Sequence, residues 1–474
     1  MGTIVLLAIF APVVGAFLLP LASRASEKLR NALSLVFVLT AFVCSAAMLK
    51  PALANQPAAV EAWLPLGMSF GFLADSLAVF MAMISSFVGS IIVFYSFTYI
   101  DHYKHKDEYY LMITLFIGAM MGLVYSTNLI FLYVFWEIST ICCWRLIGFY
   151  RDKEYVFRAD KAFLFTVFGA LMMLLGFLVI YQRTNTFNIT EMKGAQISNA
   201  AVLLILFGML SKSATLPFHT WLPDAGVAPS PVTSLLHAAV LVKIGVYAYA
   251  RLFLASFTIN DVWHTAVPVI AAVSALVAAG AAIKENDIKR IIAYSTVSQL
   301  GFIFLGLSTG SALGAAGGLL YILMHSLGKG GLFLCAGIVE HNAHTKDIRQ
   351  LGGLIKTMPL TAVSFLLCAF SIMGLPPFGG FFSKYMVISG AVRAEEPWIA
   401  AVFVIGAVMT VIYLLRVFVK VFMGEAKTPA NEGSGQMVGS VVGLAALSLA
   451  AGLFISFPSS FAQNIVSQMV VALK

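Results

Sequence analysis

Long apolar runs recur along the whole chain and limit what it can fold into. About fourteen runs approach or exceed the ~20 residues that a helix needs to cross a bilayer. Of the 474 residues, 60% are hydrophobic and 11% are charged, whereas soluble domains carry about 25% charge. The chain is therefore predicted to be an all-α polytopic membrane protein. The predicted spans are residues 3–22, 32–49, 77–99, 110–126, 129–149, 162–182, 199–218, 232–254, 263–283, 293–309, 312–338, 360–390, 398–422 and 437–458.

Two of these runs contain residues that interrupt helices. The seventh ends at Pro217 and is followed by further prolines, and the twelfth contains the sequence GLPPFGG at 374–380. Proline removes a backbone donor and glycine frees the backbone, so both helices should be discontinuous.

The two interrupted runs lie five spans apart, which predicts two related five-helix units at 110–254 and 263–422. Three helices (1–109) precede them, and one C-terminal helix (437–474) follows. An odd number of helices per unit inverts the second unit, and broken helices at matching places in inverted repeats mark ion sites.

The positive charges orient these spans. With the N-terminus outside, 19 of the 29 Lys and Arg residues fall on inside loops or span ends and 6 on outside ones. This excess predicts a multi-pass protein of the cell (cytoplasmic) membrane with both termini on the outer, periplasmic or extracellular, side. The same excess accounts for the net charge of +8. Nucleic-acid binding is not needed to explain this charge, since no dense basic run is present. The first run has no basic region before it and reads as a retained helix.

Several ionisable residues remain inside the spans, where a charge costs at least a few kcal/mol. Such residues usually serve transport, and lysine suits proton work because burial penalises its charged form. His325 and Lys329 are four residues apart and share one helix face. The candidate proton-transfer residues are Glu137, Lys212, Lys243, His325, Lys329 and Lys384, with His219 and His237 as accessory candidates.

The residue types exclude some other chemistry. Sodium or calcium cages need several carboxylates or carbonyls, and Glu137 is the one acid deep within a predicted span. The five cysteines lie in apolar runs without metal-ligand spacing, and no haem-like or iron–sulfur pattern is present. We therefore predict no metal site, no cofactor and no electron transfer by this chain.

Five blocks of sequence, in order, resemble the antiporter-like subunits of respiratory complex I, of Mrp-type cation/proton antiporters and of energy-converting membrane-bound hydrogenases. The resemblance covers about residues 70–425. The blocks are FLYVFWEISTICCWRLIGFY (131–150), SKSATLPFHTWLPDAGVAPSPVTSLLHAAVLVKIGVY (211–247), NDIKRIIAYSTVSQLGF (286–302), HSLGKGGLFLCAGIVEH (325–341) and GLPPFGGFFSKY (374–385).

The resemblance implies a proton path along a polar axis in the membrane plane. Glu137 would be the acid of the fifth helix and Lys212 its partner on the seventh. Lys243 would be the central bridging lysine, and Lys384 would be the terminal site on the broken twelfth helix. His325 and Lys329 would continue the axis between them.

The resemblance also implies partners, namely further antiporter-like subunits and small transmembrane subunits. The energy would come from a redox arm or from a counter-moving cation such as Na⁺. Both sources stay open, and so does membership of a proton-translocating oxidoreductase. The sequence CCWR at 142–145 departs from the family pattern after the acid.

Two other functions remain open. A structural subunit would use the polar axis only to hold water and stiffen a membrane arm. A substrate transporter would need varied polar groups near mid-membrane, and the row of lysines with few Asn or Gln argues against it.

Overall fold

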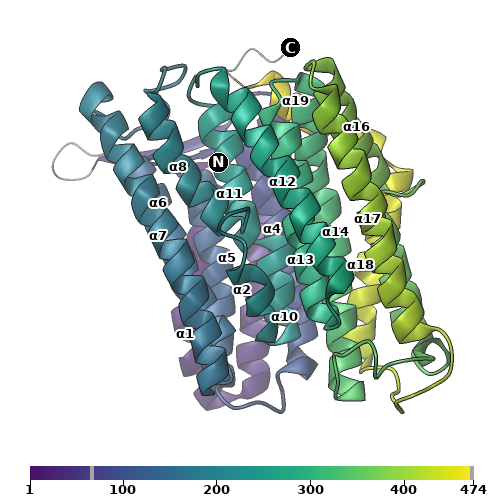
Figure 1. Ribbon diagram of the computed structural model, residues 1–474. Coiled ribbons are helices and arrows are strands. Elements are labelled where there is room, and N and C mark those ends of the chain that lie inside the picture. Colours follow the sequence, from purple (N-terminus) through teal and green to yellow (C-terminus); the bar gives the residue numbers. More distant parts are fainter. Residues whose placement is uncertain (64–68, 470–474) are drawn as a thin grey trace.

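Long helices run side by side across the whole molecule (Figure 1). The computed structural model describes residues 1–63 and 69–469. In the first half, the α-helices are α1 (Gly2–Ala25), α2 (Glu27–Ala47), α3 (Leu49–Leu53), α4 (Ser76–Tyr99), α5 (Lys106–Tyr125), α6 (Leu129–Ile147), α7 (Lys153–Thr184), α8 (Asn199–Lys212), α9 (Trp221–Asp224), α10 (Ser230–Ser234) and α11 (Leu241–Tyr249). In the second half, they are α12 (Val262–Lys284), α13 (Ile288–Ser308), α14 (Ala312–Ala343), α15 (Pro359–Met373), α16 (Gly379–Arg393), α17 (Pro397–Phe422), α18 (Gly435–Leu453) and α19 (Ser456–Ser467).

The predicted fold class is confirmed. Within the described residues, 12 helices are long and apolar enough to cross a membrane, counting 230–254 as one. That helix contains two π-helical turns, η3 (Leu235–Ala239) and η4 (Ala250–Leu254). Short 3₁₀ turns occur at η2 (Ala225–Val227) and η5 (Leu354–Lys356). The two remaining predicted spans, the seventh and the twelfth, begin with the shorter apolar helices α8 and α15.

Both interruptions occur where the sequence predicts them. After α8 the backbone turns at Ala214, which has a φ of 46°, and passes through a cis Leu216–Pro217 bond. After α15 it turns at Gly374, with a φ of 82°, and α16 resumes at Gly379. Each break leaves carbonyl groups at a helix end without their usual intrahelical partners.

The two halves share further details outside the broken helices. Asn128 forms an isolated antiparallel bridge with Asn188, and Asp287 forms the same kind of bridge with Asp347. Asn128 and Asp287 each cap the helix that follows them, α6 and α13. The second helix between the bridging residues of each half, α7 in one and α14 in the other, has 32 residues. We propose on this basis that 110–254 and 263–422 are related units, as the sequence predicts.

A small hairpin was not predicted from the sequence. Strands β1 (Ala58–Trp63) and β2 (Ser69–Ala74) pair antiparallel between α3 and α4, in a segment expected to be a loop. Phe72 is buried, and its ring lies 6.1 Å from that of Phe10 on α1 and 6.4 Å from that of Phe135 on α6. These contacts hold the hairpin against the helices.

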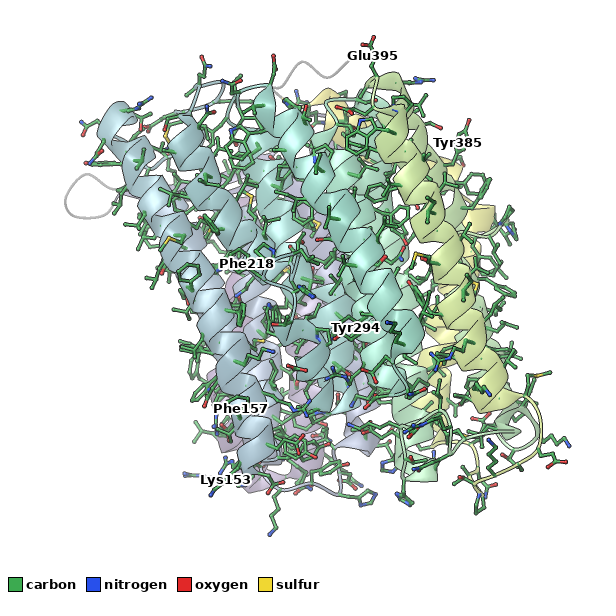
Figure 2. All side chains as sticks on the ribbon, viewed as in Figure 1. Lys153, Phe157, Phe218, Tyr294, Tyr385 and Glu395 are labelled. Atoms are coloured by element: carbon green, nitrogen blue, oxygen red, sulfur yellow. The ribbon has the colours of Figure 1, made fainter. Side chains whose placement is uncertain are left out.

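The centre of the molecule differs from its edges. Helix 230–254 is buried along its length, and α13 and α14 nearly so, whereas the outer helices α1, α7 and α17 leave much of their apolar surface exposed. Figure 2 shows Phe157 on α7 and Tyr385 on α16 at the periphery; they are 71% and 62% exposed. Exposed apolar faces suit lipid or partner helices, while the ionisable residues need the buried centre.

An ion pair connects helix 230–254 to the first three helices. The Nη2 atom of Arg251 donates to Asp75 Oδ1 (2.7 Å), and its Nε atom donates to the hydroxyl of Tyr247 (2.9 Å). Asp75 also caps α4 by accepting from Ala78 N–H (2.9 Å). Arg251 is buried, so the carboxylate of Asp75 is its compensating charge.

Replacing Asp75 with Asn should lower the free energy of unfolding by about 3–5 kcal/mol, because the buried Arg251 charge would lose its partner. The measurement is thermal unfolding of the detergent-purified protein. Glu27→Gln is the matched control, since this carboxylate is 54% exposed in its pair with Lys106 and should contribute at most about 1 kcal/mol. Equal shifts in both variants would contradict the prediction.

Candidate proton-conducting site

Glu137 and Lys212 lie near one another on α6 and α8 without forming a direct ion pair. Lys212 is fully buried, and its Nζ atom donates to Thr140 Oγ1 (2.7 Å) and to the carbonyl of Trp136 (3.3 Å). Glu137 is half-buried one turn before Thr140, and its Oε1 atom has no hydrogen-bond partner among the described residues. No contact within 4.0 Å joins the two charges. Through Thr140, Lys212 of α8 is thus hydrogen-bonded to α6, the helix that carries Glu137.

The break in the seventh helix places Lys212 where it is. Lys212 is the last residue of α8. On either side of it, the carbonyl of Ser211 accepts from Trp221 Nε1 (3.0 Å), and the hydroxyl of Ser213 donates to the carbonyl of Val242 (2.9 Å). Val242 is next to Lys243 in α11, so the end of α8 is fastened directly to the central helix.

The loop beyond this break is held by charge. Asp224 accepts from Lys161 Nζ (2.7 Å) and from Arg290 Nη1 (2.7 Å). Burial acts to raise the pKa of Asp224, but these two hydrogen bonds outweigh burial and hold the pKa below its ordinary value. The carboxylate therefore stays charged and links α7, the loop after α8, and α13.

Lys243 and His325 form the shortest link between two of the predicted residues. Lys243 Nζ lies 2.7 Å from His325 Nδ1, and both side chains are fully buried. A hydrogen bond at this distance needs a proton on one nitrogen and a free lone pair on the other. The lysine and the histidine therefore cannot both be fully protonated. The pair is a place where a proton is shared between α11 and α14.

Lys329 and Lys384 are fully or almost fully buried, and each donates to a backbone carbonyl. Lys329 Nζ donates to the carbonyl of Ile292 (3.0 Å), and Lys384 Nζ donates to that of Ile372 (2.7 Å). Ile372 belongs to the last turn of α15, so Lys384 caps the carbonyl end left free by the break. The Lys384 ammonium also lies 4.5 Å from the centre of the Phe302 ring.

The two accessory histidines differ in their surroundings. His237 is fully buried in the π-helical turn η3, with its ring 4.5 Å from that of Phe333 on α14. Neither of its ring nitrogens has a hydrogen-bond partner among the described residues. His219 is half-buried just after the cis bond that ends in Pro217, and its Nδ1 atom likewise lacks a partner in the described chain.

Sequence reasoning missed a network of neutral polar groups beside Lys384. The Tyr321 hydroxyl donates to Gln299 Oε1 (2.6 Å), and Gln299 Nε2 donates to Thr410 Oγ1 (3.1 Å). The Tyr321 ring lies 6.1 Å from that of His325 and 5.6 Å from the Lys384 ammonium. The polar side chain of Gln299 within an apolar span was the available signal.

Comparison with known proteins identifies the family of this chain. Residues 126–410 match the family described as NADH:quinone oxidoreductase/Mrp antiporter, TM. Residues 63–110 match the family described as NADH-Ubiquinone oxidoreductase (complex I), chain 5 N-terminus. The first match covers more than half of the chain.

Individual relatives agree with the family match. The chain is 37% identical to a Na(+)/H(+) antiporter subunit of Alkalihalophilus pseudofirmus over 410 residues, which is 78% of this chain and 50% of that protein. It is 32% identical to a Na(+)/H(+) antiporter subunit of Staphylococcus haemolyticus over 87% of this chain and 55% of that protein. The chain thus spans about half the length of the curated relatives it matches.

Two solved structures show the same fold. One is the Mrp complex from Dietzia sp. DQ12-45-1b, with a TM-score of 0.90, 22% identity and coverage of 100% of this chain and 98% of that one. The other is an archaeal membrane-bound sulfane sulfur reductase, with a TM-score of 0.90, 23% identity and coverage of 99% and 98%. The resemblance predicted from five sequence blocks is confirmed, and the chain belongs to the family of antiporter-like transmembrane subunits that NADH:quinone oxidoreductases and Mrp antiporters share.

Proposed function

We propose that this chain translocates protons as an antiporter-like subunit of a multisubunit membrane complex, and that the complex is of the Mrp type, exchanging Na⁺ for H⁺. The observation that carries the proposal is the fully buried hydrogen bond of 2.7 Å between Lys243 and His325. A lysine and a histidine that share one proton in the middle of a membrane are suited to passing that proton on. The names of the relatives, Na⁺/H⁺ antiporter subunits, support the exchanged cation.

On this proposal the path follows the predicted residues. A proton reaches the axis from the inside near Lys212 and Lys243, passes His325 and Lys329, and leaves outward from Lys384. Glu137 controls the charge on Lys212, because a carboxylate nearby favours the protonated amine. Both chain termini lie on the outer side of the membrane, as the Lys and Arg distribution indicates.

The path needs an energy source and partners. Each charge moved against 100 mV costs about 2.3 kcal/mol, and the chain has no predicted redox centre of its own. The other subunits are further antiporter-like and small transmembrane proteins, which would cover the exposed apolar helix faces. Dependence of proton movement on added Na⁺, with no electron donor present, would separate an Mrp-type complex from one driven by a redox arm.

Glu137→Ala and Lys212→Ala test the proposal. In the assembled complex, reconstituted into vesicles, each should lower the rate of Na⁺-driven proton movement at least about tenfold, since loss of a proton-transfer group typically costs 10²–10⁴ in rate. Glu154→Ala is the control, because Glu154 is exposed and pairs with Arg158 one turn away. Unchanged transport in both test variants would contradict a relay through these residues.

Lys384→Ala separates transport from a purely structural role. If the chain only stiffened the membrane arm, this variant would assemble and the complex would transport normally. We expect assembly with strongly reduced transport, measured by recovery of the purified complex and by the same vesicle assay.

A further inference from the structure

A second buried charge cluster lies at the Lys/Arg-rich end of the molecule, apart from the axis described above. Lys289, near the start of α13, is 1% exposed, and its Nζ atom donates to Glu340 Oε2 (3.0 Å) and to the carbonyl of Ala228 (2.7 Å). Glu340, in the last turn of α14, also accepts from the Ser230 hydroxyl (3.0 Å). Three segments distant in sequence thus meet at one carboxylate.

This cluster reaches the surface through aromatic and imidazole side chains. Glu340 is 27% exposed. Next to it in sequence, the His341 ring lies 5.5 Å from that of Tyr99 and stacks 6.3 Å from that of His102, which is exposed. The Tyr99 hydroxyl is 3.4 Å from Ser230 Oγ. Imidazole, phenol and hydroxyl groups therefore extend from the exposed His102 to the buried serine.

From Ser230 the polar groups continue inward along the central helix. Ser234 is one turn further and donates to the carbonyl of Gly330 (3.3 Å), which follows Lys329 directly. His237 is about one turn further again, fully buried, with both ring nitrogens unpaired among the described residues. A buried imidazole without protein partners calls for water or a mobile proton.

Helix α14 faces this part of the central helix. On α14, Glu340 meets Ser230, Gly330 meets Ser234, Phe333 meets the His237 ring, and His325 meets Lys243. The two helices therefore lie side by side and run antiparallel between the Ser230–Glu340 contact at the surface cluster and the central Lys243–His325 pair. The close approach is possible because Gly337 carries no side chain; a Cβ there would lie 2.5 Å from the Ser230 Cβ.

We infer that Glu340 and Lys289 form a proton-access site that connects the Lys/Arg-rich surface with the axis through Ser230, Ser234 and His237. The inference rests on the proposed function and adds a second connection to it. The Glu340 carboxylate takes a proton from surface water or His341, and its hold on Lys289 weakens. Water beside the hydroxyls of Ser230 and Ser234 carries the proton inward, since these side chains do not bond one another directly, and His237 then binds the transferred proton.

Each step conserves the proton. The neutral imidazole of His237 becomes imidazolium, passes its proton to the amine of Lys329, and returns to the neutral form. The Glu340 carboxylate is regenerated when its proton leaves, and it binds Lys289 again. No oxidant or reductant takes part.

The test distinguishes a relay from an ion pair that only stabilises the fold. Glu340→Gln keeps the size of the side chain but cannot carry a proton, and it should reduce Na⁺-driven proton movement by the assembled complex at least about fivefold. Because this variant leaves Lys289 without its counter-charge, the double variant Lys289→Met with Glu340→Leu is measured in parallel. Replacing both partners of a buried pair with apolar residues is often neutral for stability.

We expect the double variant to assemble normally and still to transport protons slowly. We expect slow proton transport by the His237→Leu variant as well. Normal transport by the double variant would overturn it and leave the pair a structural one. Lys212→Ala, measured in the same vesicles, keeps the two proposals apart. If proton transport is slow in Lys212→Ala but normal in the double variant, the access site is disproved and the proposed function stands. If Lys212→Ala also transports normally, the proposed function fails.

Discussion

Lys243→Met should reduce proton movement by the assembled complex at least about tenfold without preventing assembly. Lys243 shares a proton with His325 across 2.7 Å in a fully buried site, and methionine fills a similar volume without a group that binds a proton. Removing a proton-transfer group typically costs 10²–10⁴ in rate. The measurement is proton uptake into vesicles containing the reconstituted complex, started by an outward or inward Na⁺ gradient.

Two further variants make this result specific. Lys243→Arg keeps a positive donor near His325, but arginine does not release its proton in proteins. It should therefore be as slow as Lys243→Met if the lysine transfers protons, and near normal if the lysine only holds His325 in place. Lys153→Met is the control, because Lys153 is exposed at the start of α7. Equal rates for Lys243→Met and Lys153→Met would contradict a central role.

Gly380→Ala should lower the free energy of unfolding by about 3 kcal/mol or more, because it forces apart the two halves of the broken twelfth helix. A Cβ at Gly380 would lie 1.8 Å from the carbonyl oxygen of Ser371, an overlap with backbone that no side-chain rotation relieves. Overpacking a close-packed site costs about 1–3 kcal/mol, and occasionally more. The measurement is the thermal unfolding midpoint of the detergent-purified protein.

Gly439→Ala is the matched control for this prediction. Gly439 lies in α18, and a Cβ there would meet nothing within 4 Å. Alanine is favoured over glycine in a helix by about 1 kcal/mol, so this variant should unfold at the same temperature as the unmodified protein or slightly higher. A comparable fall in both variants would show that glycine flexibility, rather than close approach, matters at position 380.

Much of the architecture could be predicted from local sequence. A bilayer has a fixed thickness and provides no backbone hydrogen bonds, so hydropathy alone locates the spans. The interruptions at Pro217 and Gly374 were predictable for a similar reason, since proline and glycine act on their own backbone. Lys212, Lys243, Lys329 and Lys384 stood out because a charge is costly within an apolar run wherever the run is placed.

Contacts between distant segments were not predictable in this way. The distribution of Lys and Arg placed Lys289 at the inside end of a span, yet the structure buries Lys289 and joins its side chain to that of Glu340. The pairing of β1 with β2 was not predicted either, and Phe72 of β2 packs against residues of α1 and α6 that are distant in sequence.

The sequence alone therefore determined that the chain spans a membrane, where two of its spans break, and which ionisable residues lie within them, and it predicts how the spans are oriented. Only the tertiary structure decided which of these residues touch. Lys243 and His325 form a hydrogen bond although they are 82 positions apart, and Lys212 donates a hydrogen bond to Thr140 rather than pairing with Glu137. The physical reason is range: hydropathy and backbone chemistry act over a few residues, whereas a side chain's partner depends on how helices from distant parts of the chain pack.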